Sequence, residues 1–143
     1  MFKYSHVLYA VDLSDMDLDK SIKKVVEAAK ASNTKVTIVH YVQSITDIYD
    51  PYYSTMIDQE TRDNIVKAAN DKLLDLVSGY DLDKSCLFVE AVSNIKVSLV
   101  KLAKELEVDA IYLNGHNHNI IGRLGSVADY IINKAECDVT ILK

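Results

Sequence analysis

The chain contains few of the residues that mark disulfide-bonded or irregular proteins. Its 143 residues include two cysteines, one proline and four glycines. Cys86 and Cys137 lack the spacing of a zinc or redox motif, so we interpret both as packing residues at strand edges and expect no disulfide. Scarce proline and glycine, together with 49% hydrophobic residues, predict a compact globule rather than a disordered chain.

Positive charge and long apolar runs are also scarce. Lysine and arginine number 16 against 21 aspartates and glutamates, a net charge of -5. Nucleic acids and anionic membrane surfaces attract clustered lysine and arginine, so neither is an expected partner. No apolar run approaches the length needed to cross a bilayer, and the first residues lack the hydrophobic core of a signal peptide. We therefore expect a cytoplasmic protein, with residues 1–143 forming a single domain.

Strand and helix patterns alternate along the chain. Short apolar runs predict five strands, at residues 7–11, 36–42, 86–92, 110–113 and 139–142. Helical spacing of apolar residues predicts helices that begin near Ser14, span residues 55–77, run from Ile95 to Leu106 and cover residues 127–135. Lys23, Lys24, Lys101 and Lys104 are expected on solvated helix faces. The alternation predicts an α/β fold: a five-stranded parallel sheet, open and doubly wound, flanked by helices on both faces.

Three separated segments point to one edge of this sheet, where the carboxyl ends of the strands lie. Asp12 ends the first strand, Tyr41 lies near the end of the second, and Gly115 follows the fourth. Ligands of open α/β sheets bind beyond these ends, so the convergence predicts a binding site. Asp12 also suits a second role, as a cap that accepts amide hydrogen bonds at the start of the following helix.

The loop between the fourth strand and the last helix is the second candidate feature. Gly115 opens it, and Gly125-Ser126 leads into Val127 and the helix, so backbone amides and a hydroxyl are expected to converge on an anion. Residues 116–119 read His-Asn-His-Asn where a phosphate cradle favours glycine, because each Cβ limits the approach of a ligand. The sequence of this loop allows two interpretations: the loop binds a phosphate, or it binds no ligand and Ser126 only caps the last helix.

Several histidines and tyrosines allow both a functional and a structural interpretation. His116 and His118 resemble a metal pair, but alternate loop residues without a carboxylate or cysteine at ligand spacing are more often solvated, so no metal site is predicted. Residues 49–53 carry three tyrosines around a proline, which suits stacking on a base or covering the core or a partner chain. His40, within a strand, is expected to be a hydrogen-bonded interior or rim residue.

The order of these motifs matches a known family. The opening strand is Tyr9-Ala-Val-Asp12-Leu-Ser14, the second begins Val36-Thr-Ile-Val-His40, and Gly115-His-Asn-His, Gly125-Ser-Val and Cys137-Asp-Val-Thr-Ile-Leu142 close the chain. With these features the chain resembles the universal stress protein family over essentially its whole length. The resemblance implies a fold of the Rossmann-like, adenine nucleotide alpha hydrolase-like kind.

Nucleotide-binding members of that family carry a loop of glycine, two residues, glycine, nine residues, and glycine followed by Ser or Thr. In this chain Gly115 matches the first glycine and Gly125-Ser126 the last pair, but His118 replaces the second glycine and the loop is three residues shorter. These departures resemble the universal stress protein A branch, whose typical members are thought not to hold ATP. The missing residues remove roughly 10 Å of contour, which favours a monophosphate or no ligand.

The resemblance also implies roles for single residues if a nucleotide binds. Asp12 would contact the ribose or adenine and the Tyr41 backbone the adenine edge. The phosphates would be held by a set of loop residues: Gly115, Gly125, Ser126 and Val127. Apart from the resemblance, His116 and His118 are able to compensate in part by donating hydrogen bonds, more strongly when protonated below about pH 6.5, which predicts pH-dependent binding. ATP or AMP is the candidate ligand.

Two functional classes follow. The first is a non-catalytic stress-response and signalling protein that acts through dimerisation and protein partners, with weak or absent nucleotide binding. The alternative is an ATP- or AMP-binding switch or slow ATPase. Catalysis is not expected, because no nucleophile–base pair, acidic pair or magnesium ligand beyond Asp12 is recognisable. Residues 139–142 form an apolar strand expected at a sheet edge, where pairing with its copy would build a homodimer, and Ile141→Lys is expected to yield monomer or aggregate.

Overall fold

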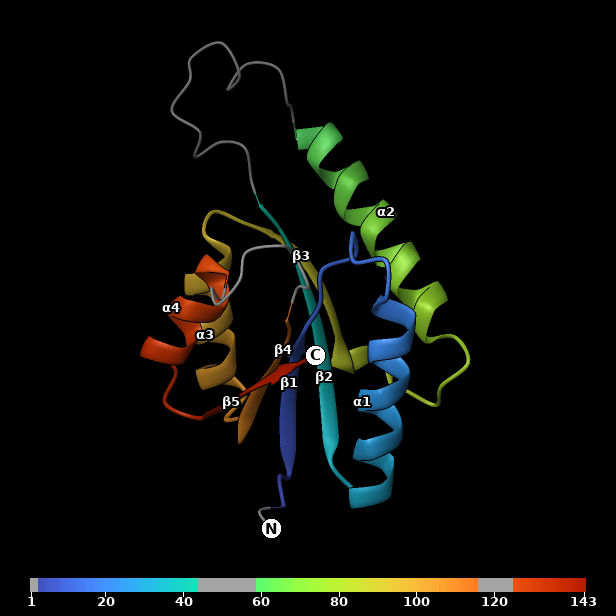
Figure 1. Ribbon diagram of the computed structural model, residues 1–143. Coiled ribbons are helices and arrows are strands. Elements are labelled where there is room, and N and C mark those ends of the chain that lie inside the picture. Colours follow the sequence, from blue (N-terminus) through green and yellow to red (C-terminus); the bar gives the residue numbers. More distant parts are fainter. Residues whose placement is uncertain (1–2, 44–58, 116–124) are drawn as a thin grey trace.

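The computed structural model of the protein describes residues 3–43, 59–115 and 125–143. These residues form five strands, four α-helices and one short 3-10 segment (Figure 1). In chain order they are β1 (His6–Ala10), α1 (Leu18–Ser32), β2 (Lys35–Gln43), α2 (Gln59–Val77), η2 (Lys84–Cys86), β3 (Leu87–Val92), α3 (Ile95–Glu105), β4 (Ala110–Asn114), α4 (Ser126–Lys134) and β5 (Asp138–Leu142). The predicted alternation of strand and helix is confirmed.

The five strands form a single parallel sheet in the order β3-β2-β1-β4-β5. The chain first builds outward from β1 to β3, then returns to the centre to add β4 and β5 on the other side. Helices α1 and α2 cover one face of the sheet, and α3 and α4 cover the other (Figure 1). The predicted open, doubly wound architecture is therefore confirmed, with its change of direction between β1 and β4.

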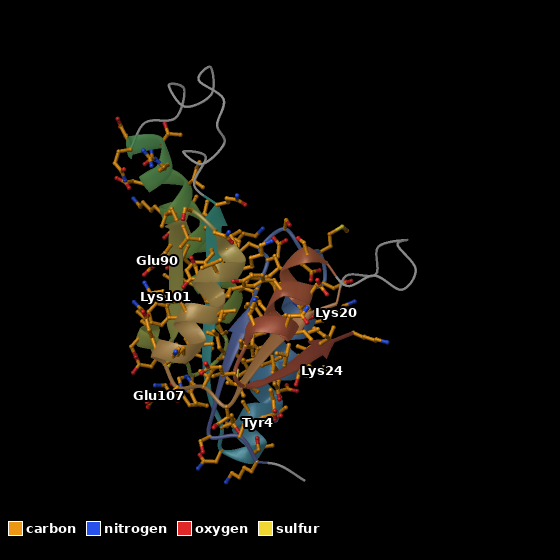
Figure 2. All side chains as sticks on the ribbon, turned by 90° about the vertical axis from the view of Figure 1, so that its left-hand side faces the viewer. Tyr4, Lys20, Lys24, Glu90, Lys101 and Glu107 are labelled. Carbon is orange, nitrogen blue, oxygen red and sulfur yellow. The ribbon has the colours of Figure 1, made fainter. Side chains whose placement is uncertain are left out.

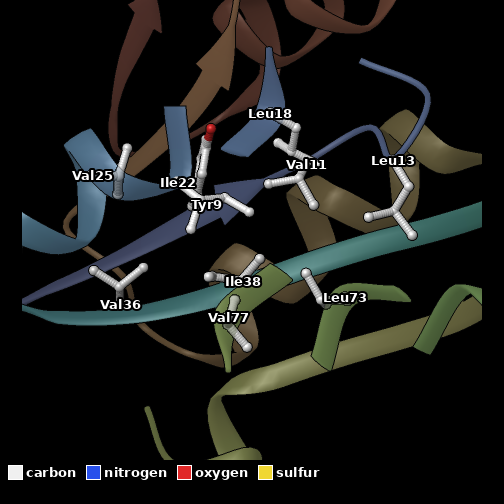
Figure 3. Close-up of a cluster of buried hydrophobic side chains, with 10 residues drawn as sticks. All are labelled: Tyr9, Val11, Leu13, Leu18, Ile22, Val25, Val36, Ile38, Leu73 and Val77. Carbon is white, nitrogen blue, oxygen red and sulfur yellow. The ribbon is translucent and has the colours of Figure 1, made fainter. Parts of the chain in front are cut away.

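The core consists of two apolar layers, one on each face of the sheet. Tyr9 and Ile38 point to the α1 and α2 side, where they pack with Leu73 (Figure 3). Leu8 points to the opposite side and packs with Ile131. All five side chains are 0% exposed. Adjacent residues of β1 thus bury both faces of the strand, as expected for the centre of a parallel sheet.

Helix α1 begins later than the sequence predicts, and the β1–α1 loop shows why. The prediction placed the helix start near Ser14, but α1 begins at Leu18. The Oδ1 atom of Asp12 accepts hydrogen bonds from the backbone N and Oγ of Ser14 at 2.9 and 2.7 Å, and Asp15 Oδ1 accepts one from Asp17 N at 3.0 Å. These side-chain turns compete with the helix for the same backbone groups. The residue at the N-cap of α1 is Asp17, so Asp12 is not its cap.

The surface and the cysteines agree with the predictions. Lys24 on α1 and Lys101 on α3 project from the surface (Figure 2), and Lys101 Nζ lies 3.9 Å from the carboxylate of Glu105, which is also exposed. Cys86 and Cys137 are both free thiols in half-buried positions, as expected for packing residues. Among the helices that the structure describes, none is long and apolar enough to span a membrane.

Asp109 joins the amino ends of β1 and β4, opposite the predicted site. Its Oδ2 accepts hydrogen bonds from Ser5 N at 2.7 Å and His6 N at 2.9 Å. The bonds from the His6 and Ser5 amides hold the pKa of the Asp109 carboxyl below its usual value. A carboxyl whose pKa is lowered by folding stabilises the protein fully at a pH above its unfolded-state pKa, about 3.9. This stabilisation is lost as the pH falls through the folded-state pKa.

We therefore expect Asp109→Asn to be less stable than the unmodified protein at pH 7, with a difference that shrinks as the pH falls below about 4. Thermal melts of both proteins between pH 7 and pH 2.5 measure the difference in Tm directly. An equal Tm difference at both ends of this range would contradict the proposed role of the ionised carboxylate.

Candidate functional site

The candidate site lies where the sheet changes direction. Strands β1 and β4 are hydrogen-bonded neighbours, with Ala10 aligned with Leu113. Asp12 and Gly115 each follow two residues beyond this aligned pair, so they extend from adjacent strand ends. Helix α4 begins at the same end of the sheet and leads back to β5 (Figure 1). The ends of β1 and β4, which lead into Asp12 and Gly115, thus lie side by side at the edge that the sequence predicts, and α4 starts at the same end of the sheet.

The backbone of the β1–α1 loop is held by side chains from two other elements. His40 of β2 lies with its Nδ1 3.0 Å from the Val11 carbonyl oxygen, and Lys72 of α2 donates to the Leu13 carbonyl at 2.8 Å. A carbonyl only accepts, so the His40 Nδ1 carries the proton. The prediction that His40 is a hydrogen-bonded interior or rim residue is confirmed, since the side chain is half-buried and bonded to the loop. The turn that carries Asp12 is consequently fixed against β2 and α2.

Tyr41 lies near the end of β2, and its side chain packs into the core. It is aligned with Glu90 of β3, and its ring packs with the apolar layer beneath α3 and α4. Burial, together with the nearby carboxylates of Glu90 and Glu105, raises the pKa of Tyr41 to about 12. The side chain is therefore a neutral packing residue, and the predicted contact of its backbone with adenine stays a prediction.

Gly115 has a structural reason to be glycine. Its N–H donates a hydrogen bond to the carbonyl of Leu142 in β5. A Cβ at this position would lie 3.0 Å from Ile141 Cγ2 and 3.1 Å from the Leu142 oxygen. Because its amide already has an acceptor and its α-carbon lies close to β5, the absence of a side chain at Gly115 allows β5 to pack against the end of β4. Its predicted contact with phosphate remains a prediction.

Gly125 and Ser126 present the open start of α4. Gly125 is the N-cap, exposed and in extended conformation with φ -60° and ψ 159°, and provides no side-chain cap. A Cβ there would meet nothing within 4 Å. Ser126 is the first helical residue rather than the cap, so the alternative that Ser126 merely caps the helix is wrong. Val127, half-buried, packs against the core. The first-turn amides of α4 form a positive helix end suited to an anion.

Two histidines and a tyrosine-rich segment were further candidates in the sequence. His116, His118 and the Tyr49–Tyr53 segment lie outside the described residues. Within residues 3–43, 59–115 and 125–143, no group of three or more histidine, cysteine, aspartate or glutamate side chains is arranged to hold a metal ion.

The sequence reasoning missed a polar network beneath the site. The Tyr9 hydroxyl donates to Asn114 Oδ1 at 2.9 Å, and Asn114 Nδ2 lies 3.5 Å from Asp15 Oδ2. Burial raises the pKa of the Tyr9 hydroxyl. Two signals were present: a tyrosine in the otherwise aliphatic run at residues 7–11, and an asparagine directly before Gly115.

The sheet order and the site at its change of direction define a Rossmann-like α/β protein. The family model described as "Universal stress protein family" matches residues 3–143. The chain belongs to the universal stress protein family, which confirms the resemblance found in the sequence.

Individual relatives agree with this assignment. The chain is 28% identical to universal stress protein A homolog 1 of Coxiella burnetii, covering 95% of this chain and 94% of that one. Its fold matches the universal stress protein UspA from Lactobacillus plantarum with a TM-score of 0.69 at 21% identity, over 100% of both chains. It also matches a universal stress protein solved in complex with cAMP, with a TM-score of 0.60 at 25% identity, over 99% and 98% of the two chains.

Proposed function

We propose that this protein is a non-catalytic, cytoplasmic stress-response and signalling protein that acts as a homodimer and binds a nucleotide only weakly. The main observation is that polar groups at the candidate site already form hydrogen bonds within the protein. Asp12 Oδ1 accepts two hydrogen bonds from Ser14, and the Gly115 amide donates to Leu142. A ligand must therefore rely on the remaining groups at this edge, which favours low affinity.

The same geometry disfavours catalysis. Asp12 Oδ1 accepts two hydrogen bonds from Ser14, and Asp15 accepts one from Asp17 on Oδ1 and one from Asn114 on Oδ2, so both side chains are engaged within the fold. Both aspartates thus shape the β1–α1 loop. A function in binding and signalling fits this arrangement better than general-base chemistry.

Weak binding of a mononucleotide is supported by the start of α4. Gly125 leaves space for an anion beside the amides of the first helical turn. The relative at 25% identity was solved with cAMP, a nucleotide with one phosphate. Because the loop before α4 is three residues shorter than the family's nucleotide-binding pattern, one phosphate is easier to enclose than three. AMP is the ligand that we propose, with its phosphate at Ser126 and Val127.

Calorimetric titration with AMP, and with ATP and Mg²⁺, tests this proposal. We expect AMP to bind weakly and ATP more weakly still. Gly125→Val places a branched side chain in the phosphate position, where the backbone tolerates it, and should weaken AMP binding at least about tenfold. Gly79→Val is the matched control, because a Cβ at Gly79 also meets nothing within 4 Å and the residue lies beyond α2.

Two results would count against the proposal. Tight ATP binding with turnover would favour the alternative of a switch or slow ATPase. If a protein shown to be folded gives no heat of binding with AMP, nucleotide binding is excluded from the proposed function, and the protein acts through its surfaces alone.

The homodimer is supported by the position of β5. This strand lies at the edge of the sheet and pairs only with β4 among the described strands. The Ile141 side chain, however, packs toward the α3 and α4 layer and lies close to Gly115. Ile141→Lys would therefore disturb the core as well as the edge, so a substitution that affects the edge backbone alone is the sharper test of the dimer.

A further inference from the structure

We propose that Tyr9 and Asn114 are positioning residues of the nucleotide site: the buried Tyr9 hydroxyl fixes the Asn114 carboxamide, which ties the β1–α1 loop to the end of β4 through Asp15. The inference rests on the proposed function, since it concerns the geometry of the same site. Tyr9 belongs to β1, Asn114 to β4 and Asp15 to the loop, so the network joins three segments at the change of direction of the sheet.

The orientation of Asn114 follows from its two neighbours. An aspartate carboxylate only accepts hydrogen bonds, so the Asn114 atom that faces Asp15 is the nitrogen, at 3.5 Å. The oxygen then faces Tyr9, whose hydroxyl donates to it at 2.9 Å. The Tyr9 side chain is 0% exposed and lies among packed apolar residues near Ile22 and Val25 (Figure 3). Because the ring is enclosed by its neighbours, the hydroxyl is a fixed point for the carboxamide.

The network connects the two segments that are candidates for nucleotide contact. Asn114 directly precedes Gly115, and the Asp15 amide donates to the Asp12 carbonyl at 3.0 Å. A tether from Asn114 to Asp15 therefore sets the separation between the Asp12 turn and the end of β4. His40 and Lys72 hold the same loop from β2 and α2, while Asn114 holds it from β4. A loop fixed before the ligand arrives loses less freedom on binding.

Asn114→Asp breaks the tether with a minimal change of shape. It replaces the amide nitrogen by oxygen and sets two carboxylates against each other, while Tyr9 still has an acceptor. In the ligand-free protein we expect hydrogen exchange of the backbone amides of residues 14–17 to become about tenfold faster, and AMP to bind about tenfold more weakly. Tyr9→Phe removes only the hydroxyl and should weaken AMP binding about three- to tenfold.

A double substitution separates positioning from general damage. Asn114→Asp combined with Asp15→Asn exchanges the amide and the carboxylate between the two positions, so a hydrogen bond between them forms again. We expect this pair to restore both slow exchange in the loop and AMP affinity. Asn133→Asp is the matched control, because it makes the same change of charge on an exposed asparagine of α4.

The outcomes are distinguishable from those of the proposed function. The inference is overturned if Asn114→Asp matches the Asn133→Asp control in loop exchange, or if the exchanged pair folds but does not restore slow exchange. Both results come from the ligand-free protein. If the unmodified protein binds no AMP, the proposed function fails while the exchange data still decide the tether. If AMP binds the unmodified protein and Asn114→Asp equally well, the tether has no role in binding and the inference fails alone.

Discussion

Val139→Pro is expected to convert the proposed homodimer into a folded monomer. Two hydrogen bonds show which backbone groups of β5 face β4. The Asp138 N–H donates to the carbonyl of Asp109, the residue before β4, and the Leu142 carbonyl accepts from the Gly115 N–H. Backbone groups of successive strand residues point alternately to the two sides, so Val139 and Ile141 direct theirs to the open edge. Proline at 139 removes an outward N–H and obstructs a strand that pairs there, yet removes no bond to β4.

Light scattering coupled to size-exclusion chromatography measures the change in mass, and circular dichroism confirms that the variant is folded. Thr140→Pro is the matched control, because its N–H faces β4. We expect that variant to lose stability, whatever its mass. A Val139→Pro protein that remains dimeric would exclude the β5 edge as the dimer interface.

Gly115→Ala is expected to destabilise the protein with or without nucleotide. Its Cβ would lie 3.0 Å from Ile141 Cγ2 and 3.1 Å from the Leu142 oxygen, so β5 must shift or the end of β4 must open. Added volume at a tightly packed position costs about 1–3 kcal/mol, which corresponds to a fall in Tm of roughly 3–10 °C for a domain of this size. Differential scanning calorimetry measures this directly.

Gly125→Ala is the matched control, since its Cβ meets nothing within 4 Å and its φ of -60° suits any residue. We expect its Tm to stay within about 1 °C of the unmodified protein's. The two glycines flank the same loop, so the pair separates a glycine required by packing from one that leaves room for a ligand. Equal stability of the two variants would contradict the close approach of β5 to Gly115.

Much of the fold was predictable because its signals are local. The runs at residues 7–11 and 36–42 are apolar and β-branched, and they form β1 and β2 within one or two residues of the predicted bounds. The start of α1 was not predictable from its acidic residues alone. Asp12 and Asp15 are common at helix starts, but here their side chains close turns that delay the helix to Leu18.

The candidate site was predictable in place but not in detail. Asp12 and Gly115 were expected at one edge because parallel strands end on the same side. That the Gly115 amide donates to Leu142 was not predictable, since Leu142 lies 27 positions further along the chain. Nor was the pairing of Tyr9 with Asn114, which are separated by 105 residues. The sequence pattern shows that each of these residues is unusual at its position, but it does not indicate which distant residue forms the hydrogen bond with it.

The amino-acid sequence by itself determined the alternation of strands and helices, the family and the edge of the sheet where polar residues gather. These depend on periodic burial and on motifs whose members are close in the chain. The tertiary structure alone decided that Gly115 serves β5, that Asp12 closes its own turn, and that Tyr9 and Asp15 meet at Asn114. Such contacts exist only once the order β3-β2-β1-β4-β5 has placed β1 beside β4 and β4 beside β5, because no local preference encodes which distant backbone will lie alongside.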